Sequence, residues 1–529
     1  MEKVAHLISF KTSGKSRIKK EYLILSLILL LGFFLRVYKI RDYIVFLGDE
    51  GRDALVVHGI LHGDLTLLGP TSSVGGFFLG PIYYYFMAPF LLLSNYDPVG
   101  PAIMVVLFGI ATIFLVYQVG REFFGKKAGL ISSLLYAISP IVIVYSRSSW
   151  NPNVFPFFTI ASLYSLYKAV SKNKWWLFVL SGILMGINLQ IHYLATFVGA
   201  IMFFYILFVE FKPNLSWFVN SLKRYLLMLA GFIIGFSPFI AFELRHSFTN
   251  SLNILHFIIN SEETGISGEL YRNSYNVFLR LFGGLSISLP APSNFKNFDP
   301  ALIQVWIIAS VILGVSSIGF FLYLFFKERK DSAAFKKYLL VLIWGIVGIG
   351  LFSFYQKPIY DYYLGFLYPL PFILIGAMLS FIWNGYKKIG IALSIFALAV
   401  LVLVNLKFTP IAVPGNHQVD QVKMISEFLL SKTNGKPFNL ALMSAGNSDH
   451  AYKYFFKLAG RDPTVILNPE IDPERNSVTS QLYVICEKSV PCAPLGYSLW
   501  EIAGFGRAEI EDRWDYQLVE IFKLVHYGE

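Results

Sequence analysis

The sequence predicts an all-α polytopic membrane protein that carries a small α/β domain at its C-terminal end. Apolar runs of roughly 20 residues, long enough to cross a bilayer, recur along most of the 529-residue chain. Charged residues make up only 15% of the chain, well below the roughly 25% usual in soluble domains. Residues 407–529 differ from the rest, because short strand and amphipathic helix patterns replace the long apolar runs.

Clusters of lysine and arginine between the apolar runs predict the topology. A net charge of +11 can indicate nucleic-acid binding. Here, however, the clusters lie in short loops, and the positive-inside rule explains that placement better. We therefore expect no nucleic-acid partner. The N-terminus is therefore expected in the cytoplasm and the C-terminal domain outside. The clusters expected to be cytoplasmic are 1–21, 120–127, 168–174, 211–224, 327–337 and 384–388.

About eleven helices satisfy this topology and form a transmembrane domain over residues 22–406. The first is expected to be a retained helix, since no small-residue cleavage site of a signal peptide follows it. Residues 81–93 number only 13, too few to span, so we expect a re-entrant or interfacial helix within a long first external loop, 41–98. The predicted spans are 22–40, 99–119, 128–146, 154–170, 175–191, 194–210, 225–242, 301–326, 338–355, 362–383 and 389–406.

Residues 407–529 are predicted to form a separate external domain, with Pro410 and Pro414 marking the linker. Two segments, 437–445 and 481–487, have strand patterns, and two others, 417–432 and 449–460, have amphipathic helix patterns. Cys486 and Cys492 fall outside the membrane, where a disulfide can form. Their spacing leaves open whether they are bridged.

Four charges in five residues follow the first predicted span, in the stretch "GDEGRDA" (48–54). One interpretation is a solvated loop. The other is an active site, because a carboxylate beside a membrane cavity is partly desolvated and becomes a stronger base. The nearby segment "GPTSSVGGFFLGP" has a composition that shapes binding surfaces. Residues 52–65 are predicted to form an amphipathic helix on the membrane surface, with Leu55, Ile60 and Leu61 inward.

The Asp-Glu-x-Arg motif and three later stretches resemble membrane glycosyltransferases of the GT-C class. The resemblance is to the group of protein O-mannosyltransferases and lipid A aminoarabinose transferases, which is glycosyltransferase family 39-like, and it covers roughly residues 20–405. The further matching stretches are "GPIYYYFMAPFL", "VYQVGREFFGKKAGLISSLLYAISPIVIVYSRSSWNP" and "YDYYLGFLYPLPF".

The resemblance implies transfer of a sugar, with inversion, from a polyprenyl-phosphate donor to an acceptor at the external face of a cell membrane. Asp49 would act as the general base, Glu50 would orient a partner, and Arg52 would stabilise the departing phosphate. The sugar, whether hexose or pentose, stays open. The acceptor also stays open and is a protein, a lipid or a polysaccharide.

Five further residues are candidates for substrate contacts. Arg147 and Lys357 are predicted to contact the donor phosphate, and Asn151, His192 and Tyr363 to contact substrate. For each of them a structural role, such as a snorkelling arginine at the membrane interface, is an alternative.

No metal site and no cofactor are predicted. The second external loop, "SRSSWNPN", offers no carboxylate where many GT-C enzymes carry an Asp, and an Asn is a poor replacement for an acidic ligand of a hard cation.

Two other functions compete with this hypothesis. An O-antigen polymerase or ligase would carry its key residues in a late external loop, here 243–300 with Arg245, Arg272 and Arg280. A flippase or transporter of prenyl-linked sugars would carry charges within its spans and a repeat between its halves. The sequence shows neither of these two features of a transporter.

Overall fold

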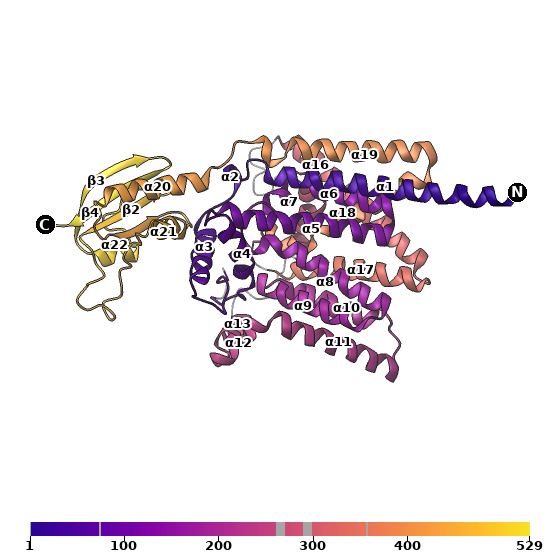
Figure 1. Cartoon of the computed structure of the whole chain (residues 1–529), viewed down its shortest axis with the longest axis horizontal. Coiled ribbons are helices and arrows are strands. Elements are labelled where there is room, and N and C mark those ends of the chain that lie inside the picture. The colour runs from indigo at the N-terminus through magenta and orange to yellow at the C-terminus, as the bar shows by residue number, and fades with distance from the viewer. Residues whose placement is uncertain (1, 73–75, 261–269, 289–298, 356–357, 529) are drawn as a thin grey trace.

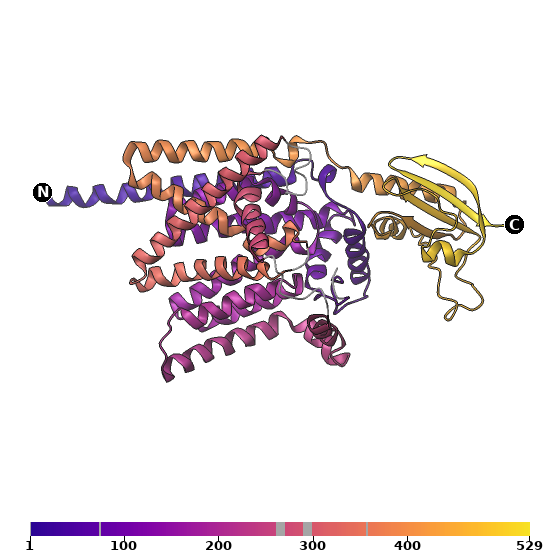
Figure 2. The ribbon, with the colours of Figure 1, turned by 180° about the vertical axis from the view of Figure 1, so that it is seen from behind.

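The computed structural model describes residues 2–72, 76–260, 270–288, 299–355 and 358–528. It consists of a bundle of roughly parallel and antiparallel helices with a small α/β domain at one end, and the N-terminus lies at the other end (Figure 1). The view from behind shows the same arrangement (Figure 2). The predicted fold class is therefore confirmed.

Each predicted span coincides with helical structure. The span 128–146 is divided because Pro140 lacks the N–H that would continue the helix, and the span 225–242 is divided before Pro238. The helices that carry the predicted spans are α1 (Glu2–Val37), α5 (Val99–Phe124), α6 (Lys126–Ile138), α7 (Pro140–Tyr145), α8 (Phe155–Lys172), α9 (Trp175–Ile191), α10 (Ala195–Phe208), α11 (Leu215–Gly235), α12 (Ser237–Arg245), α16 (Pro300–Glu328), α17 (Ser332–Ser353), η4 (Asp361–Leu367), α18 (Pro369–Gly385) and α19 (Lys387–Lys407).

The number of membrane crossings stays a prediction. Among the described residues, five helices are long and apolar enough to cross a membrane, namely α5, α11, α16, α17 and α19. The number rises to six if η4 and α18, which meet at a bend of 54°, form one span. The first predicted span falls on the long α1, which is not one of these helices, and the other predicted spans fall on helices that are shorter or interrupted.

Shorter helices gather at the end of the bundle that faces the C-terminal domain. Among them, α3 lies next to that domain and α4 packs between α3 and α5, while α12 and α13 lie at the same end of the bundle, next to α11 (Figure 1). The remaining short helices are α2 (Ile40–Tyr43), α3 (Gly48–Leu61), α4 (Ile82–Leu93), η1 (Asn151–Val154), α13 (Thr249–Asn260), α14 (Leu270–Leu279), the π-helical η2 (Arg280–Gly284), α15 (Leu285–Ile287) and η5 (Pro410–Ala412).

Helix α3 is amphipathic as predicted, but its surroundings differ from the prediction. It packs between α4 and α21 (His450–Leu458) of the C-terminal domain. Ile60 is buried, as are Ala54 and Val57, and Leu55 and Leu61 are half-buried and pack against the same core. The sequence did not indicate that a second domain would cover this helix.

The C-terminal domain is a four-stranded sheet with three helices. The strands are β1 (Asn439–Met443), β2 (Gln481–Glu487), β3 (Ala508–Tyr516) and β4 (Val519–His526), in the order β1-β2-β4-β3. Strands β1 and β2 are parallel, and the other pairs are antiparallel. The helices are α20 (Gln418–Lys432), α21 and α22 (Trp500–Phe505).

The strands and helices predicted in this domain are present as β1, β2, α20 and α21. The hairpin of β3 and β4 was not predicted, because β3 is largely exposed and rich in charged residues and so lacks an alternating apolar pattern. Cys486 and Cys492 are joined by a disulfide, which resolves the alternative that the sequence left open.

Candidate active site

The "GDEGRDA" stretch forms the first turns of α3. Its N-cap residue, Leu47, has no side-chain oxygen to accept the unpaired N–H groups of a helix N-terminus. Two other side chains accept them instead. Glu50 accepts from Leu47 N at 3.1 Å, and Asn447 Oδ1, from the C-terminal domain, accepts from Gly48 N at 2.9 Å. The start of α3 is therefore fixed partly by residues of another domain.

Arg52 links two aspartates with different surroundings. It donates to Asp49 Oδ1 at 2.9 Å and to Asp53 Oδ1 at 2.8 Å. Asp53 is fully buried and also accepts from the Tyr84 hydroxyl at 3.2 Å. Burial raises the pKa of Asp53 to about 6, and the Arg52 charge opposes this rise. Asp49, in contrast, is 54% exposed, so Arg52 is anchored on one aspartate and holds the other toward open space.

Glu50 is buried close to two other carboxylates, Asp49 and Asp53. It is 8% exposed, and burial raises its pKa to about 7, with the neighbouring charges of Asp49 and Asp53 acting in the same direction. Near neutral pH this carboxyl group is therefore divided between its protonated and ionised forms. The interpretation of the motif as a solvated loop does not apply to Glu50.

Two cavities meet at Asp49. The larger one has a volume of about 750 Å³ and extends toward the C-terminal domain. The smaller one has a volume of about 130 Å³ and extends toward Arg52. Asp49 and Trp150 line both cavities. A carboxylate in this position can contact molecules in either cavity.

The smaller cavity brings together five residues that the sequence singled out. Its lining includes Asp49, Arg52, Asn151, His192 and Tyr363. They come from α3, η1, the end of α9 and η4, and they span more than 300 residues of the chain. Their convergence is what a shared substrate site requires, although it does not by itself assign a role to each residue.

His192 is a neutral member of this group. It is 3% exposed, and burial lowers its pKa to about 3. Its Nδ1 accepts from Leu194 N at 3.1 Å, so the ring proton is on Nε2. The ring stacks against Phe155 and Tyr193. Such a ring can donate a hydrogen bond to a substrate but carries no charge for a phosphate.

Aromatic side chains form another wall of the smaller cavity. The ring centroids of Trp150 and Tyr362 lie 4.5 Å apart, and those of Tyr362 and Tyr363 lie 4.6 Å apart. Tyr362 was not among the predicted site residues, although it lies in the predicted Tyr-Tyr segment. Apolar faces combined with a few polar groups are typical of small-molecule sites.

The glycine-rich segment closes the same cavity, in agreement with its expected role. Pro70, Thr71, Ser72 and Leu79 line it, and a bridge between Thr71 and Phe78 pairs the two sides of the segment. The segment also requires glycine, because a Cβ on Gly80 would lie 2.3 Å from Gln190 Cγ.

Arg147, which was also predicted to contact the donor phosphate, is packed beside the chain that follows α1. Arg147 is 2% exposed, donates to the Tyr38 carbonyl at 3.0 Å, and lies over the Tyr43 ring at 4.4 Å. It is not among the described residues that line either cavity. Packing against the chain after α1 explains its burial without a substrate. Lys357 lies outside the described residues.

The C-terminal domain, whose role the sequence left open, supplies part of the larger cavity. Residues 445–448, Glu487 and Ser489 face Asp49 and Glu50 across it. Asn447 Nδ2 also donates to Glu487 Oε1 at 2.6 Å. No local pattern could have indicated this contact, since Asn447 and Gly48 are 399 residues apart.

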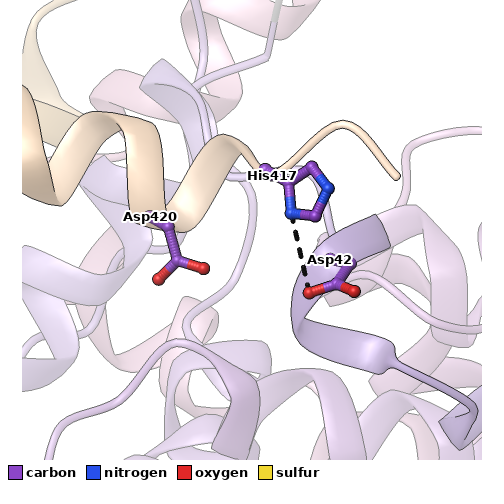
Figure 3. Close-up of side chains that lie close together, drawn as sticks. All are labelled: Asp42, His417 and Asp420. Carbon is purple, nitrogen blue, oxygen red and sulfur yellow. Dashed lines mark ion pairs between the residues drawn. The ribbon is translucent and has the colours of Figure 1, made fainter. Parts of the chain in front are cut away.

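Asp42, His417 and Asp420 were not predicted as a metal site, yet they form a group that could hold an ion (Figure 3). Their potential ligand atoms lie within 4.8 Å of one another. However, Asp420 already pairs with Arg41 at 2.7 Å. The backbone N–H of His417 donates to the Asp42 carbonyl at 2.9 Å, and His417 Nδ1 lies 3.6 Å from Asp42 Oδ1. These contacts join α2 to the start of α20, so a role in holding the domains together explains the group without a cation.

Comparisons with known proteins find similarity to membrane glycosyltransferases. Over residues 79–242 the chain matches the family model described as dolichyl-phosphate-mannose-protein mannosyltransferase. It is also 24% identical over 159 residues to a putative mannosyltransferase of Bacillus subtilis. That match spans 30% of this chain and 23% of the relative.

The whole-chain structural match decides the fold. The crystal structure of ArnT from Cupriavidus metallidurans, bound to undecaprenyl phosphate, superposes with a TM-score of 0.60 and 13% identity. The match covers 96% of this chain and 98% of ArnT. The chain has the GT-C fold.

The GT-C fold extends to a second kind of relative. The oligosaccharyltransferase AglB from Archaeoglobus fulgidus, in complex with an inhibitory peptide and a dolichol-phosphate, matches with a TM-score of 0.52 and 14% identity. That match covers 89% of this chain and 70% of AglB. The resemblance to GT-C glycosyltransferases that the sequence indicated is thus confirmed, and so is the prediction of a multi-pass membrane protein.

Proposed function

We propose that the protein transfers a sugar from a polyprenyl-phosphate donor to an acceptor at the external face of the membrane, with inversion and with Asp49 as the general base. The observation that carries this proposal is the position of Asp49 on both cavities, next to a cation that is itself held by a buried aspartate. Both the ArnT and the AglB structures contain a polyprenyl-type phosphate, which supports the class of donor.

We assign one cavity to each of the two substrates. The smaller cavity, which contains Arg52, His192 and Tyr363, receives the donor phosphate and sugar. The larger cavity, which the C-terminal domain borders, admits the acceptor. The apolar prenyl chain stays in the membrane domain, and the acceptor reaches Asp49 from the side of the C-terminal domain.

In this proposal, these side chains and the two substrates carry out the transfer as follows. An acceptor hydroxyl or amine loses its proton to Asp49 and forms a bond to the anomeric carbon. The bond between that carbon and the phosphate oxygen breaks, and the lipid phosphate leaves with the electron pair. Arg52 lies where it can offset the charge that develops on the phosphate. Glu50 caps the turn that holds Asp49 and does not lie on the smaller cavity.

The topology follows from the distribution of charge. The predicted cytoplasmic clusters lie in the turns at the end of the bundle away from the C-terminal domain, as the ends of α5, α8 and α16 show (Figure 1). The positive-inside rule assigns that end to the cytoplasm, which puts the N-terminus inside and the candidate site outside. A cysteine-labelling experiment from each side of the membrane tests the orientation.

Replacing Asp49 by Asn tests the assignment of the base. An amide cannot take up the acceptor proton, and general bases contribute about 10²–10⁴-fold, so turnover of a prenyl-phosphate sugar should fall at least about 100-fold. Asp64→Asn, an exposed aspartate in the same loop, is the matched control and should behave like the wild type. Wild-type turnover by Asp49→Asn would show that Asp49 is not the general base.

The same assay separates this function from the polymerase or ligase alternative. Arg272→Ala changes the late loop on which that alternative depends, whereas Asp49→Asn changes the first loop. A larger loss of turnover with Arg272→Ala than with Asp49→Asn would favour the alternative.

A further inference from the structure

A third cavity lies at the end of the bundle opposite the candidate active site. It has a volume of about 600 Å³ and is bordered by the end of α8, the start of α9, the start of α11 and the start of α17. Its charged lining residues are Glu210, Lys223, Arg224 and Lys336. These four residues come from two of the basic clusters, 211–224 with its border and 327–337, which the fold brings together.

The charges around this cavity favour an anion. Glu210 accepts from Arg224 Nη2 and from Lys336 Nζ, each at 2.7 Å. One carboxylate therefore fixes two cations in place and balances only one of them. With Lys223, the group of four carries a net charge of about +2. An arginine beside a carboxylate keeps further N–H donors for a phosphate oxygen, because guanidinium has five.

The surroundings place the cavity at the level of lipid headgroups. Trp175 lines it and is 65% exposed, and the adjacent Trp176 is 50% exposed. Phe211 is exposed and meets the Trp217 ring at 5.0 Å. Exposed tryptophans beside lysines and arginines at the ends of apolar helices are typical of a membrane interface. The polar lining of the cavity thus opens where phosphodiester groups are concentrated.

We propose that this cavity binds the phosphodiester headgroup of an anionic membrane lipid. Lys223 and Arg224 contact the phosphate oxygens, while Glu210 keeps Arg224 and Lys336 in position and Trp175 lies beside the glycerol region. Basic pockets between transmembrane helices recognise anionic headgroups through this chemistry. The site joins the turns after α8, α10 and α16, so an occupant stabilises the bundle independently of the proposed transfer reaction.

Lipid binding to the purified full-length protein tests this proposal. The probes are phosphatidylglycerol, phosphatidylcholine and inorganic phosphate, and the readouts are retained lipid in native mass spectrometry and the Tm in detergent. Phosphatidylglycerol should be retained and should raise the Tm, whereas phosphatidylcholine and inorganic phosphate should not. An equal effect of inorganic phosphate would show a site for free anions and would overturn the lipid assignment.

A pair of lysine variants tests the location. Lys223→Gln removes a cation that lines the cavity, and its affinity for phosphatidylglycerol should fall about fivefold. Lys172→Gln removes an exposed lysine from the last turn of α8, at the same end of the bundle but outside the cavity lining, and should bind like the wild type. Equal binding by the two variants would show that the lipid binds elsewhere, and the proposal would fail.

Discussion

Glu50 lies next to the proposed base, and folding directly changes its ionisation. Its pKa is raised from 4.5 to about 7, first by burial and then by Asp49 and Asp53. A buried acid with a raised pKa binds its proton more tightly in the folded state than in the unfolded state. Its contribution to stability is therefore complete below pH 4.5 and is lost as the pH rises through about 7.

A Glu50→Gln variant should lose this pH dependence. Glutamine can still accept from Leu47 N, so the helix cap remains. The wild-type Tm in detergent should fall relative to that of the variant as the pH rises from 4.5 to 7. Asp53 adds a change of the same sign between pH 3.8 and about 6, but it is present in both proteins. Glu427→Gln, at an exposed position of α20, is the control. Parallel Tm curves for wild type and Glu50→Gln would refute the raised pKa.

At the scale of elements, the main feature is a helix whose start is capped by another domain. Asn447 accepts from Gly48 N and donates to Glu487, and Asp49 is the next residue of the helix. Gly51 allows α21 to approach closely, since a Cβ there would lie 2.3 Å from Ala451 N. The C-terminal domain thus positions the residue that we propose as the base.

An Asn447→Ala variant should lower turnover through the position of α3. Removing a helix cap costs about 1 kcal/mol, and an equal loss at the transition state corresponds to about a fivefold fall in kcat. Asn468→Ala, which removes a side-chain acceptor from an exposed turn of the same domain, should leave kcat unchanged.

A double variant distinguishes positioning from general damage to the domain. In Asn447→Asp with Glu487→Gln, the aspartate accepts from Gly48 N and the glutamine donates to the aspartate, so the pair is rebuilt with its donor reversed. Its kcat should recover toward the wild-type value. A double variant as slow as Asn447→Ala would contradict the role of this contact.

The sequence predicted elements far better than contacts between them. The apolar runs and basic clusters located the helices of the bundle, because hydropathy and charge are local properties. The Asp-Glu-x-Arg motif located α3 and, through the resemblance, Asp49 and Arg52 of the smaller cavity, while Asn151, His192 and Tyr363 were singled out by their places in external loops and at helix ends. The exposed hairpin β3–β4 and the contact of Asn447 with Gly48 depend on distant parts of the chain, and no local pattern encodes them. The burial of Arg147 against Tyr38 and Tyr43 was likewise not encoded locally, and its predicted contact with the donor phosphate stays a prediction.

At the scale of the whole molecule, the candidate site lies between two domains that are fastened together beside it. Arg41 pairs with Asp97 at 2.5 Å and with Asp420 at 2.7 Å, and the Tyr43 hydroxyl donates to the Val413 carbonyl at 2.6 Å. These contacts hold the start of the C-terminal domain against α2. The larger cavity therefore has one wall from each domain, which suits a site that receives a lipid-linked donor and an external acceptor.

A structure of the protein with a bound polyprenyl phosphate tests the central claim most directly. The phosphate should lie in the smaller cavity, within hydrogen-bond distance of Arg52 and on the same side of Trp150 as His192 and Tyr363. The larger cavity should remain open toward Glu487. A phosphate bound out of reach of Arg52, for example against the Arg280–Asp361 pair, would contradict the assignment of this site.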